Sequence, residues 1–181
     1  MNDQPETKPS KGTTHETIET FAGWLPSGAR LIGIDGGTKR LGLAISDVTR
    51  MIASPLGLIE RRKFTIDAAE LLAHVERHRV GGLVLGLPAN LDGSEGPRAQ
   101  ATRAFARNLN AICPLPILLW DERLTTVEAE RMLISADASR KRRGEVIDKV
   151  AATLILQGAL DRLRMIERIP SGDGTDTGLD T

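Results

Sequence analysis

The sequence of 181 residues is poor in cysteine and in aromatic residues, and it contains no tyrosine. The single cysteine, Cys113, cannot form a disulfide within the chain or supply the CxxC pairs of zinc and redox sites. Aromatic residues make up 3% of the chain, so a surface that stacks nucleobases on aromatic rings is not expected. No apolar run approaches the ~20 residues of a membrane span, and no signal sequence begins the chain, so we expect no membrane contact and a cytoplasmic location.

The chain also has no net charge overall, but its charged residues are unevenly distributed along the sequence. Residues 1–29 carry a net charge of −2 and residues 170–181 carry −3, which leaves +5 on residues 30–169. Both ends lack apolar periodicity, so we predict a disordered arm over residues 1–25, one folded domain over 26–168 and a disordered acidic tail over 169–181. A basic domain favours a polyanionic partner such as a nucleic acid.

Hydrophobic periodicity in the central part predicts an α/β fold. Three strands at residues 31–35, 40–46 and 52–59 have connections short enough for antiparallel hairpins. Helical spacing over 65–78, 96–112, 126–136 and 145–166 then alternates with buried strands at 83–87 and 117–120. Right-handed crossovers place the last two strands beyond the first, which gives a mixed five-stranded sheet of order 3-2-1-4-5 with helices on both faces. This is the ribonuclease H-like architecture.

A carboxylate ends the first of these strands. Asp35 lies in the segment Gly33–Arg40, at the edge where open α/β sheets bind their ligands. The glycines leave backbone room for a phosphate or a metal ion, and Lys39 and Arg40 add positive charge. The alternative is a plain hairpin turn, because Asp before Gly is common in turns for local reasons.

Further acids follow in two other elements. Asp121 and Glu122 come after the strand at 117–120, and because side chains alternate along a strand, only one of them should face Asp35. The strand next to that of Asp35 ends in Gly86, so this acid has to reach from one strand further away. Asp148 lies beside the apolar stripe of the last helix. Three such carboxylates suit a two-metal nuclease, and hard oxygen ligands favour Mg²⁺ or Mn²⁺. The alternative for Asp121 and Glu122 is a simple exit of the strand into solvent.

Two polar segments are candidates for contacts with substrate phosphates. The loop over 86–98 contains Asn90 and Arg98 and leads into a helix whose N-terminal backbone donors can hold an anion. The run Arg140, Lys141, Arg142 and Arg143 precedes the helix that carries Asp148. An ordinary connection and a solvated basic loop are the respective alternatives.

Three segments, at residues 31–47, 83–106 and 119–161, resemble the YqgF/RuvX family. These are bacterial ribonuclease H-like proteins described as Holliday junction resolvases and as the nuclease that matures the end of pre-16S rRNA. The resemblance spans about residues 26–163 and implies metal-dependent phosphodiester hydrolysis. It implies that the catalytic, metal-binding residues are Asp35, Glu122 (with Asp121 as the alternative) and Asp148. It also implies phosphate contacts at basic positions, and the full candidate substrate-binding set is Thr38, Lys39, Arg40, Asn90, Arg98, Arg123, Arg140, Lys141, Arg142 and Arg143.

We therefore expect a nuclease that matures the 5′ end of pre-16S rRNA, with precursor rRNA as the nucleic-acid partner and ribosomal particles as a further candidate. One alternative is a resolvase of branched DNA, whose two-fold symmetric substrate favours a homodimer over a monomer. A second alternative is a non-catalytic nucleic-acid-binding module. The turn at 35–40 also resembles that of actin-like ATPases, but these need two related domains to clasp their nucleotide.

Overall fold

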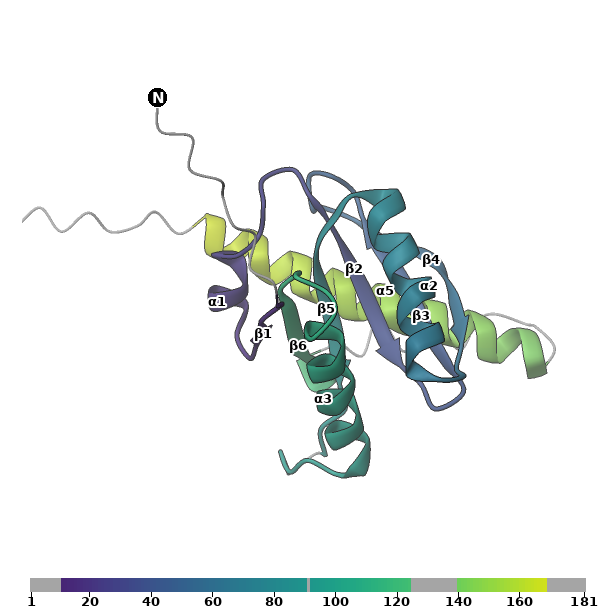
Figure 1. Cartoon of the computed structure of the whole chain (residues 1–181). Coiled ribbons are helices and arrows are strands. Elements are labelled where there is room, and N and C mark those ends of the chain that lie inside the picture. The colour runs from purple at the N-terminus through teal and green to yellow at the C-terminus, as the bar shows by residue number, and fades with distance from the viewer. Residues whose placement is uncertain (1–10, 91, 125–139, 169–181) are drawn as a thin grey trace, which may run out of the picture.

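The computed structural model describes residues 11–90, 92–124 and 140–168, and for residues 140–143 it describes the backbone alone. A mixed sheet has the order β1-β6-β5-β2-β3-β4 (Figure 1). Its strands are β1 (Thr14–His15), β2 (Arg30–Gly36), β3 (Arg40–Ser46), β4 (Ala53–Glu60), β5 (Val80–Leu87) and β6 (Ile117–Asp121). Strands β2, β3 and β4 are antiparallel neighbours, and β5 and β6 run parallel to β2. The predicted five-strand order is confirmed, and β1 adds a sixth strand.

The disordered arm predicted over residues 1–25 is wrong from Thr14 onward, because a short strand and a short helix form there. Thr14 and His15 pair in parallel with Ile117 and Leu118 of β6. Helix α1 (Ile18–Ala22) follows, with Phe21 fully buried. A two-residue strand and a five-residue helix are too short to give a periodic signal, so their apolar contacts with the domain could not be recognised in the sequence. Residues 1–10 and 169–181 lie outside the described residues.

Helices cover both faces of the sheet, as predicted. Helices α2 (Phe64–His78) and α3 (Pro97–Asn110) pack on one face, and the long helix α5 (Arg140–Glu167) crosses the other (Figure 1). A 3₁₀ turn, η1 (Glu122–Leu124), follows β6. The helix predicted over 126–136 lies outside the described residues. Helix α5 begins earlier than expected, so the basic run at 140–143 belongs to a helix and not to a loop. Across the described ranges, none of the helices is long and apolar enough to span a bilayer.

The core consists of two apolar clusters, one on each face of the sheet. Strand β5 is buried along its whole length, as its continuous apolar sequence predicts for a central strand. The face under α5 is filled by the last four turns of that helix. The predicted apolar stripe of α5 begins at Ile147 and is only partly right, because Ile147 is 44% exposed. The buried positions of α5 are Ala152, Ile155, Leu156, Ala159, Leu160 and Leu163.

Three glycines on this face let α5 approach the sheet. A Cβ atom on Gly33 would lie 2.6 Å from the Cβ of Leu156, and one on Gly42 would lie 2.0 Å from the carbonyl oxygen of Asp148. A Cβ on Gly86 would lie 2.5 Å from a methyl group of Ile155. These separations are far below van der Waals contact, so the present position of α5 requires glycine in β2, β3 and β5.

We predict that Gly42→Ala lowers the free energy of unfolding by about 1–3 kcal/mol, because the added methyl group pushes against the backbone of α5. Gly57→Ala in β4 is the matched control, since a Cβ there meets no atom within 4 Å. Urea unfolding of both variants measures the difference. Equal stability of the two variants would contradict the close contact at Gly42.

Candidate functional site

Asp35 is held at the carboxyl end of β2, on the face that α5 covers. It alternates with Gly33 along the strand and pairs with Gly42 of the antiparallel neighbour β3. The side chain is half-buried. The pKa of Asp35 is raised to about 6, mainly by burial and next by the negative charge of Asp148, while the positive charge of Arg98 acts in the opposite direction. Asp35 is therefore a carboxylate that lacks sufficient compensating positive charge.

Glu122 reaches the same face from β6. Trp120, two residues earlier, packs against α5, where a Cβ on Gly158 would lie 3.1 Å from its indole. The carboxylate oxygen Oε1 of Glu122 lies 2.7 Å from the position that a Cβ on Gly86 would occupy. Glu122 thus extends over β5, between β6 and β2. Burial and then the charge of Asp35 raise the pKa of Glu122 above its usual value.

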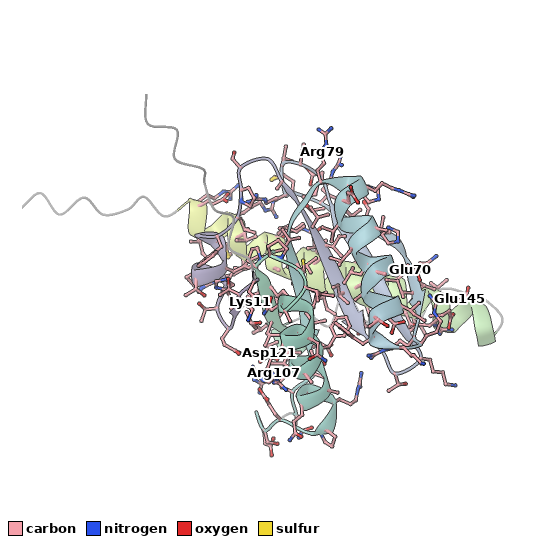
Figure 2. The ribbon with its side chains drawn as sticks, viewed as in Figure 1. Lys11, Glu70, Arg79, Arg107, Asp121 and Glu145 are labelled. Atoms are coloured by element: carbon pink, nitrogen blue, oxygen red, sulfur yellow. The ribbon has the colours of Figure 1, made fainter. Side chains whose placement is uncertain are left out.

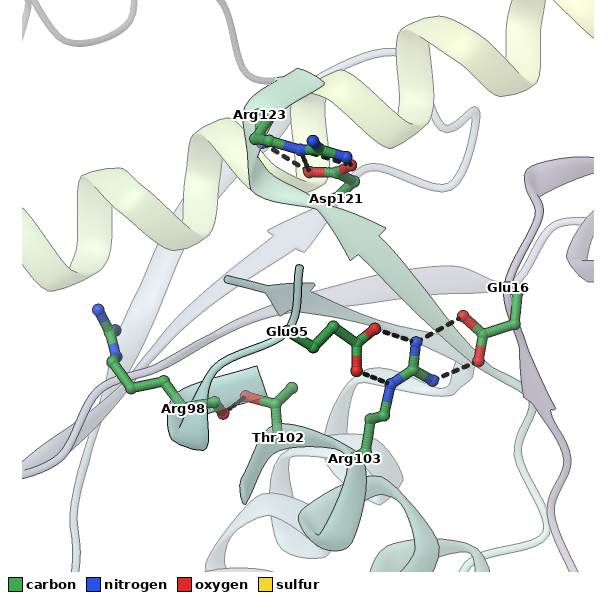
Figure 3. Close-up of polar contacts among 7 residues, drawn as sticks. All are labelled: Glu16, Glu95, Arg98, Thr102, Arg103, Asp121 and Arg123. Atoms are coloured by element: carbon green, nitrogen blue, oxygen red, sulfur yellow. Dashed lines mark hydrogen bonds and ion pairs between the residues drawn. The ribbon is translucent and has the colours of Figure 1, made fainter. Parts of the chain in front are cut away.

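Asp121 has a different environment from its neighbour Glu122. Its Oδ2 accepts a hydrogen bond from Nη2 of Arg123 at 2.6 Å, and Nε of Arg123 donates to both of its oxygens (Figure 3). These hydrogen bonds lower the pKa of Asp121. The geometry therefore couples Glu122, and not Asp121, to Asp35, which matches the alternation of side chains along β6.

Asp148 lies on α5, and its backbone contacts Gly42 of β3. Its Oδ2 accepts a hydrogen bond from Nε of Arg40 at 2.7 Å, and the two side chains are 21% and 18% exposed. This ion pair raises the pKa of Arg40. Arg40, which the sequence suggested as a phosphate contact, is thus engaged by the acid of α5.

The three acids do not form one compact cluster. Among the side chains that the structure describes, no three Asp, Glu, His or Cys residues gather closely enough to hold a metal ion. Asp35 is instead coupled electrostatically to Glu122 on one side and to Asp148 on the other. Carboxylate oxygens fit a hard divalent cation, and Asp35 and Glu122, whose pKa values are raised by burial, gain most from added positive charge.

Arg61 and Arg98 lie on the face of the sheet opposite to α5, beside the turn that follows Asp35. Thr38 and Arg98 line a cavity of about 60 Å³ with Arg61, a residue that the sequence reading missed. Nη1 of Arg61 donates to the carbonyl oxygen of Gly37 at 3.1 Å. The signal that could have identified Arg61 is its position as the first residue after β4, which pairs with β3 beside the turn. Lys39 is exposed in this turn.

The remaining candidates are spread along the rim of the sheet edge. The amide nitrogen of Asn90 donates to Oγ of Ser94 at 2.9 Å within the loop after β5. Arg123 is bound by Asp121, and the side chains of residues 140–143 lie outside the described part of the chain. The fold therefore brings six of the candidates to one edge of the sheet: Asp35, Glu122, Asp148, Arg40, Arg98 and Thr38. Asn90 and Arg123 lie at the border of this edge.

Comparisons with known proteins agree with this fold. A family model described as "RuvX: Holliday junction resolvase" matches residues 29–162. A Paracoccus denitrificans protein is 62% identical over 84% of this chain and 97% of its own, and a Cereibacter sphaeroides protein is 62% identical over 85% and 96%. Both are named "Putative pre-16S rRNA nuclease". RuvC of T. thermophilus, solved with a Holliday junction substrate, has a TM-score of 0.51 and 13% identity, and covers 75% of this chain and 96% of its own. That likeness concerns the fold alone.

We predict that Asp35→Asn stabilises the metal-free protein at pH 7.5 by about 1–2 kcal/mol and has no such effect near pH 4. The pKa of Asp35 is about 6 in the folded protein, above its ordinary value of 3.8, so the folded state binds more protons than the unfolded state between these values. Stability of the wild type therefore falls as the pH rises through this window, and asparagine removes the loss.

Thermal unfolding in chelator at both pH values measures this effect. Asp47→Asn is a control of opposite sign, because hydrogen bonds from Thr49, Met51 and Ile52 lower the pKa of Asp47. That variant should be less stable than the wild type at pH 7.5. A destabilised Asp35→Asn protein at pH 7.5 would contradict the charge imbalance at the sheet edge.

Proposed function

The chain belongs to the RuvX family, and we propose that it is a metal-dependent nuclease that hydrolyses phosphodiester bonds of precursor 16S rRNA. The main support is the pair Asp35 and Glu122. These two carboxylates come from the ends of different strands and lie half-buried on one face of the sheet edge. The charge of Asp35 raises the pKa of Glu122, and the charge of Asp148 raises the pKa of Asp35. Structural acids are usually neutralised by an ion pair, whereas acids left in mutual repulsion are typical of functional sites.

Asp35 would hold Mg²⁺ or Mn²⁺ with its two electrostatically coupled neighbours, Glu122 on one side and Asp148 on the other, as pairs of carboxylates and not as one cluster of three. Such an ion, when bound, lowers the pKa of an attacking water and stabilises the leaving oxygen of the phosphodiester. Arg40 keeps the carboxylate of Asp148 at the edge, through its hydrogen bond to Oδ2. Arg98 partly offsets the negative charge of both Asp35 and Glu122, which favours their ionised form at neutral pH.

Substrate phosphates would be bound by cations that surround the acids. A polyanion that approaches carboxylates is repelled unless positive charge lies nearby. Arg98, Lys39 and Thr38 supply donors on the side of α3, and Asn90 and Arg123 supply them beyond β6. The helical run at 140–143 adds four cations to the N-terminal end of α5. These contacts position the backbone and carry no sequence information.

The choice of RNA rests on the names of the relatives, since a metal site alone does not recognise a 2′-hydroxyl group. Precursor rRNA also places the enzyme in the cytoplasm, in contact with assembling ribosomal particles. The decisive experiment therefore compares cleavage of a 5′-extended pre-16S rRNA fragment and of a four-way DNA junction by one preparation, with Mg²⁺ and with Mn²⁺.

We predict that Asp35→Asn and Glu122→Gln each reduce cleavage of the rRNA fragment at least ~100-fold, because each removes a charge that holds the ion. Asp161→Asn is the control, since Asp161 lies on α5 and hydrogen-bonds with Gln157 and Arg164 away from the site. Preferential cleavage of the junction would assign the activity to branched DNA. Absence of cleavage of both substrates, or full activity of Asp35→Asn, would refute the proposed nuclease.

We further predict that replacing residues 140–143 with alanine weakens rRNA binding and flattens its dependence on salt. If all four side chains contact phosphates, the slope of log affinity against log salt decreases by up to ~3, at about 0.7 for each contact with single-stranded RNA. Single-turnover cleavage at saturating substrate should change much less, because the acids remain.

The control for this variant removes charge at the far end of the sheet. Arg77→Gln combined with Arg79→Asn is suitable, since Arg79 lies at the opposite end from Asp121 (Figure 2). Asparagine also tolerates the left-handed backbone of Arg79, whose φ is 52°. A salt slope that is unchanged in the 140–143 variant would identify the run as a solvated surface of α5.

A further inference from the structure

We infer that Arg103 is a positioning residue that, through Glu95 and Glu16, fixes the described loop residues 88–90 and 92–96 beside the sheet edge that carries Asp35 and Glu122. The N-terminal segment would then influence substrate affinity although it lies outside residues 29–162, which the family model matches. The inference deepens the proposed function and rests on it, since it assigns the loop a part in binding the substrate.

One guanidinium binds two carboxylates from separate segments (Figure 3). Arg103, on α3, donates from Nε and Nη2 to the two oxygens of Glu95, at 2.8 and 2.6 Å. It donates from Nη1 and Nη2 to the two oxygens of Glu16, the second at 3.1 Å. Arginine alone among the cationic side chains has the planar fork for such a double bidentate contact. We call this group the Arg103 clamp; it consists of Glu16, Glu95 and Arg103.

The loop that the clamp holds is closed by its own hydrogen bonds. The backbone N–H of Asn90 donates to the carbonyl oxygen of Ser94 at 3.0 Å, and that of Gly93 donates to Asn90 at 2.9 Å. The N–H of Ser94 donates to Oδ1 of Asp92 at 2.9 Å. Because these bonds tie the described residues of the loop to one another, a shift at Glu95 is transmitted to Asn90.

The other side of the loop borders the candidate site. A Cβ on Gly93 would lie 3.4 Å from Nη1 of Arg123, which is bound to Asp121 at the end of β6. Glu122 is the next residue along the chain from Asp121. The loop is thus held between the clamp and the strand end that carries one of the proposed metal ligands, and small changes of the clamp alter how Asn90 and Arg123 face the substrate.

Glu16 gives the clamp a fixed support. It lies between β1, which pairs with β6, and α1, whose Phe21 is fully buried. Arg103 is 28% exposed, Glu95 is 35% exposed and Glu16 is 58% exposed, so solvent screens the contact with Glu95 only in part and the contact with Glu16 more strongly. Hydrogen bonds then lower the pKa of Glu95 and raise that of Arg103, as expected for a persistent ion-pair network.

Steady-state kinetics with the rRNA fragment tests the positioning role. We expect Arg103→Met to raise KM about 5-fold or more and Glu16→Gln to raise it about 3-fold, with kcat within about 2-fold of the wild type. Arg103→Lys should recover part of the loss, because a lysine keeps the charge but not the fork. Glu19→Gln is the matched control, since Glu19 lies in the same segment but pairs with Arg162 of α5 at 3.4 Å. An unchanged KM in Arg103→Met, or a loss confined to kcat, would overturn the inference.

Amide hydrogen exchange provides a second test that does not depend on catalysis. Arg103→Met and Glu16→Gln should exchange the amides of residues 92–96 several-fold faster than the wild type, whereas Glu19→Gln should not. Unchanged exchange in this loop would refute the clamp even in an active enzyme. Faster exchange in a protein that cleaves no substrate would retain the clamp and reject only the proposed function.

Discussion

The close contact of α5 with the sheet determines both the core and the candidate site. Glycine at position 42 lets the backbone of Asp148 lie directly on β3, at the residue that pairs with Asp35. Glycine at position 86 leaves the space that the carboxylate of Glu122 occupies between β6 and β2. A side chain at either position would move apart the acids that we propose act together. Packing and electrostatics are therefore coupled, because the contact that seals the core also brings like charges together.

The sequence predicts the sheet well where strands have a continuous apolar pattern. The order of β4, β3, β2, β5 and β6 follows from hairpin lengths and right-handed crossovers. The prediction fails at Thr14–His15 and Ile18–Ala22. These short elements are stabilised by contacts with distant residues and show no periodicity of their own. The sequence also predicts the start of α5 too late, because the basic residues 140–143 show no apolar periodicity although they belong to the helix.

The sequence proposes the residue types of the candidate site, but it does not predict how these residues pair in the fold. Alternation along β6 allowed for either Asp121 or Glu122, and only the fold shows which of them faces α5. The ion pair between Arg40 and Asp148 joins residues 108 positions apart. The Arg103 clamp likewise joins Glu16 to α3 across 87 positions. No spacing rule connects such residues, since tertiary packing alone brings them together.

The scarcity of aromatic residues has a spectroscopic consequence. The chain has two tryptophans and no tyrosine, so its intrinsic fluorescence comes from two indoles in different environments. Trp24 is 51% exposed, whereas Trp120 is 7% exposed and lies two residues from Glu122. Emission from Trp24 is accessible to a quencher in solution, and that from Trp120 is shielded by α5. The quencher-resistant fraction therefore reports selectively on the strand that carries the proposed ligand, and the protein needs no attached dye to follow events there.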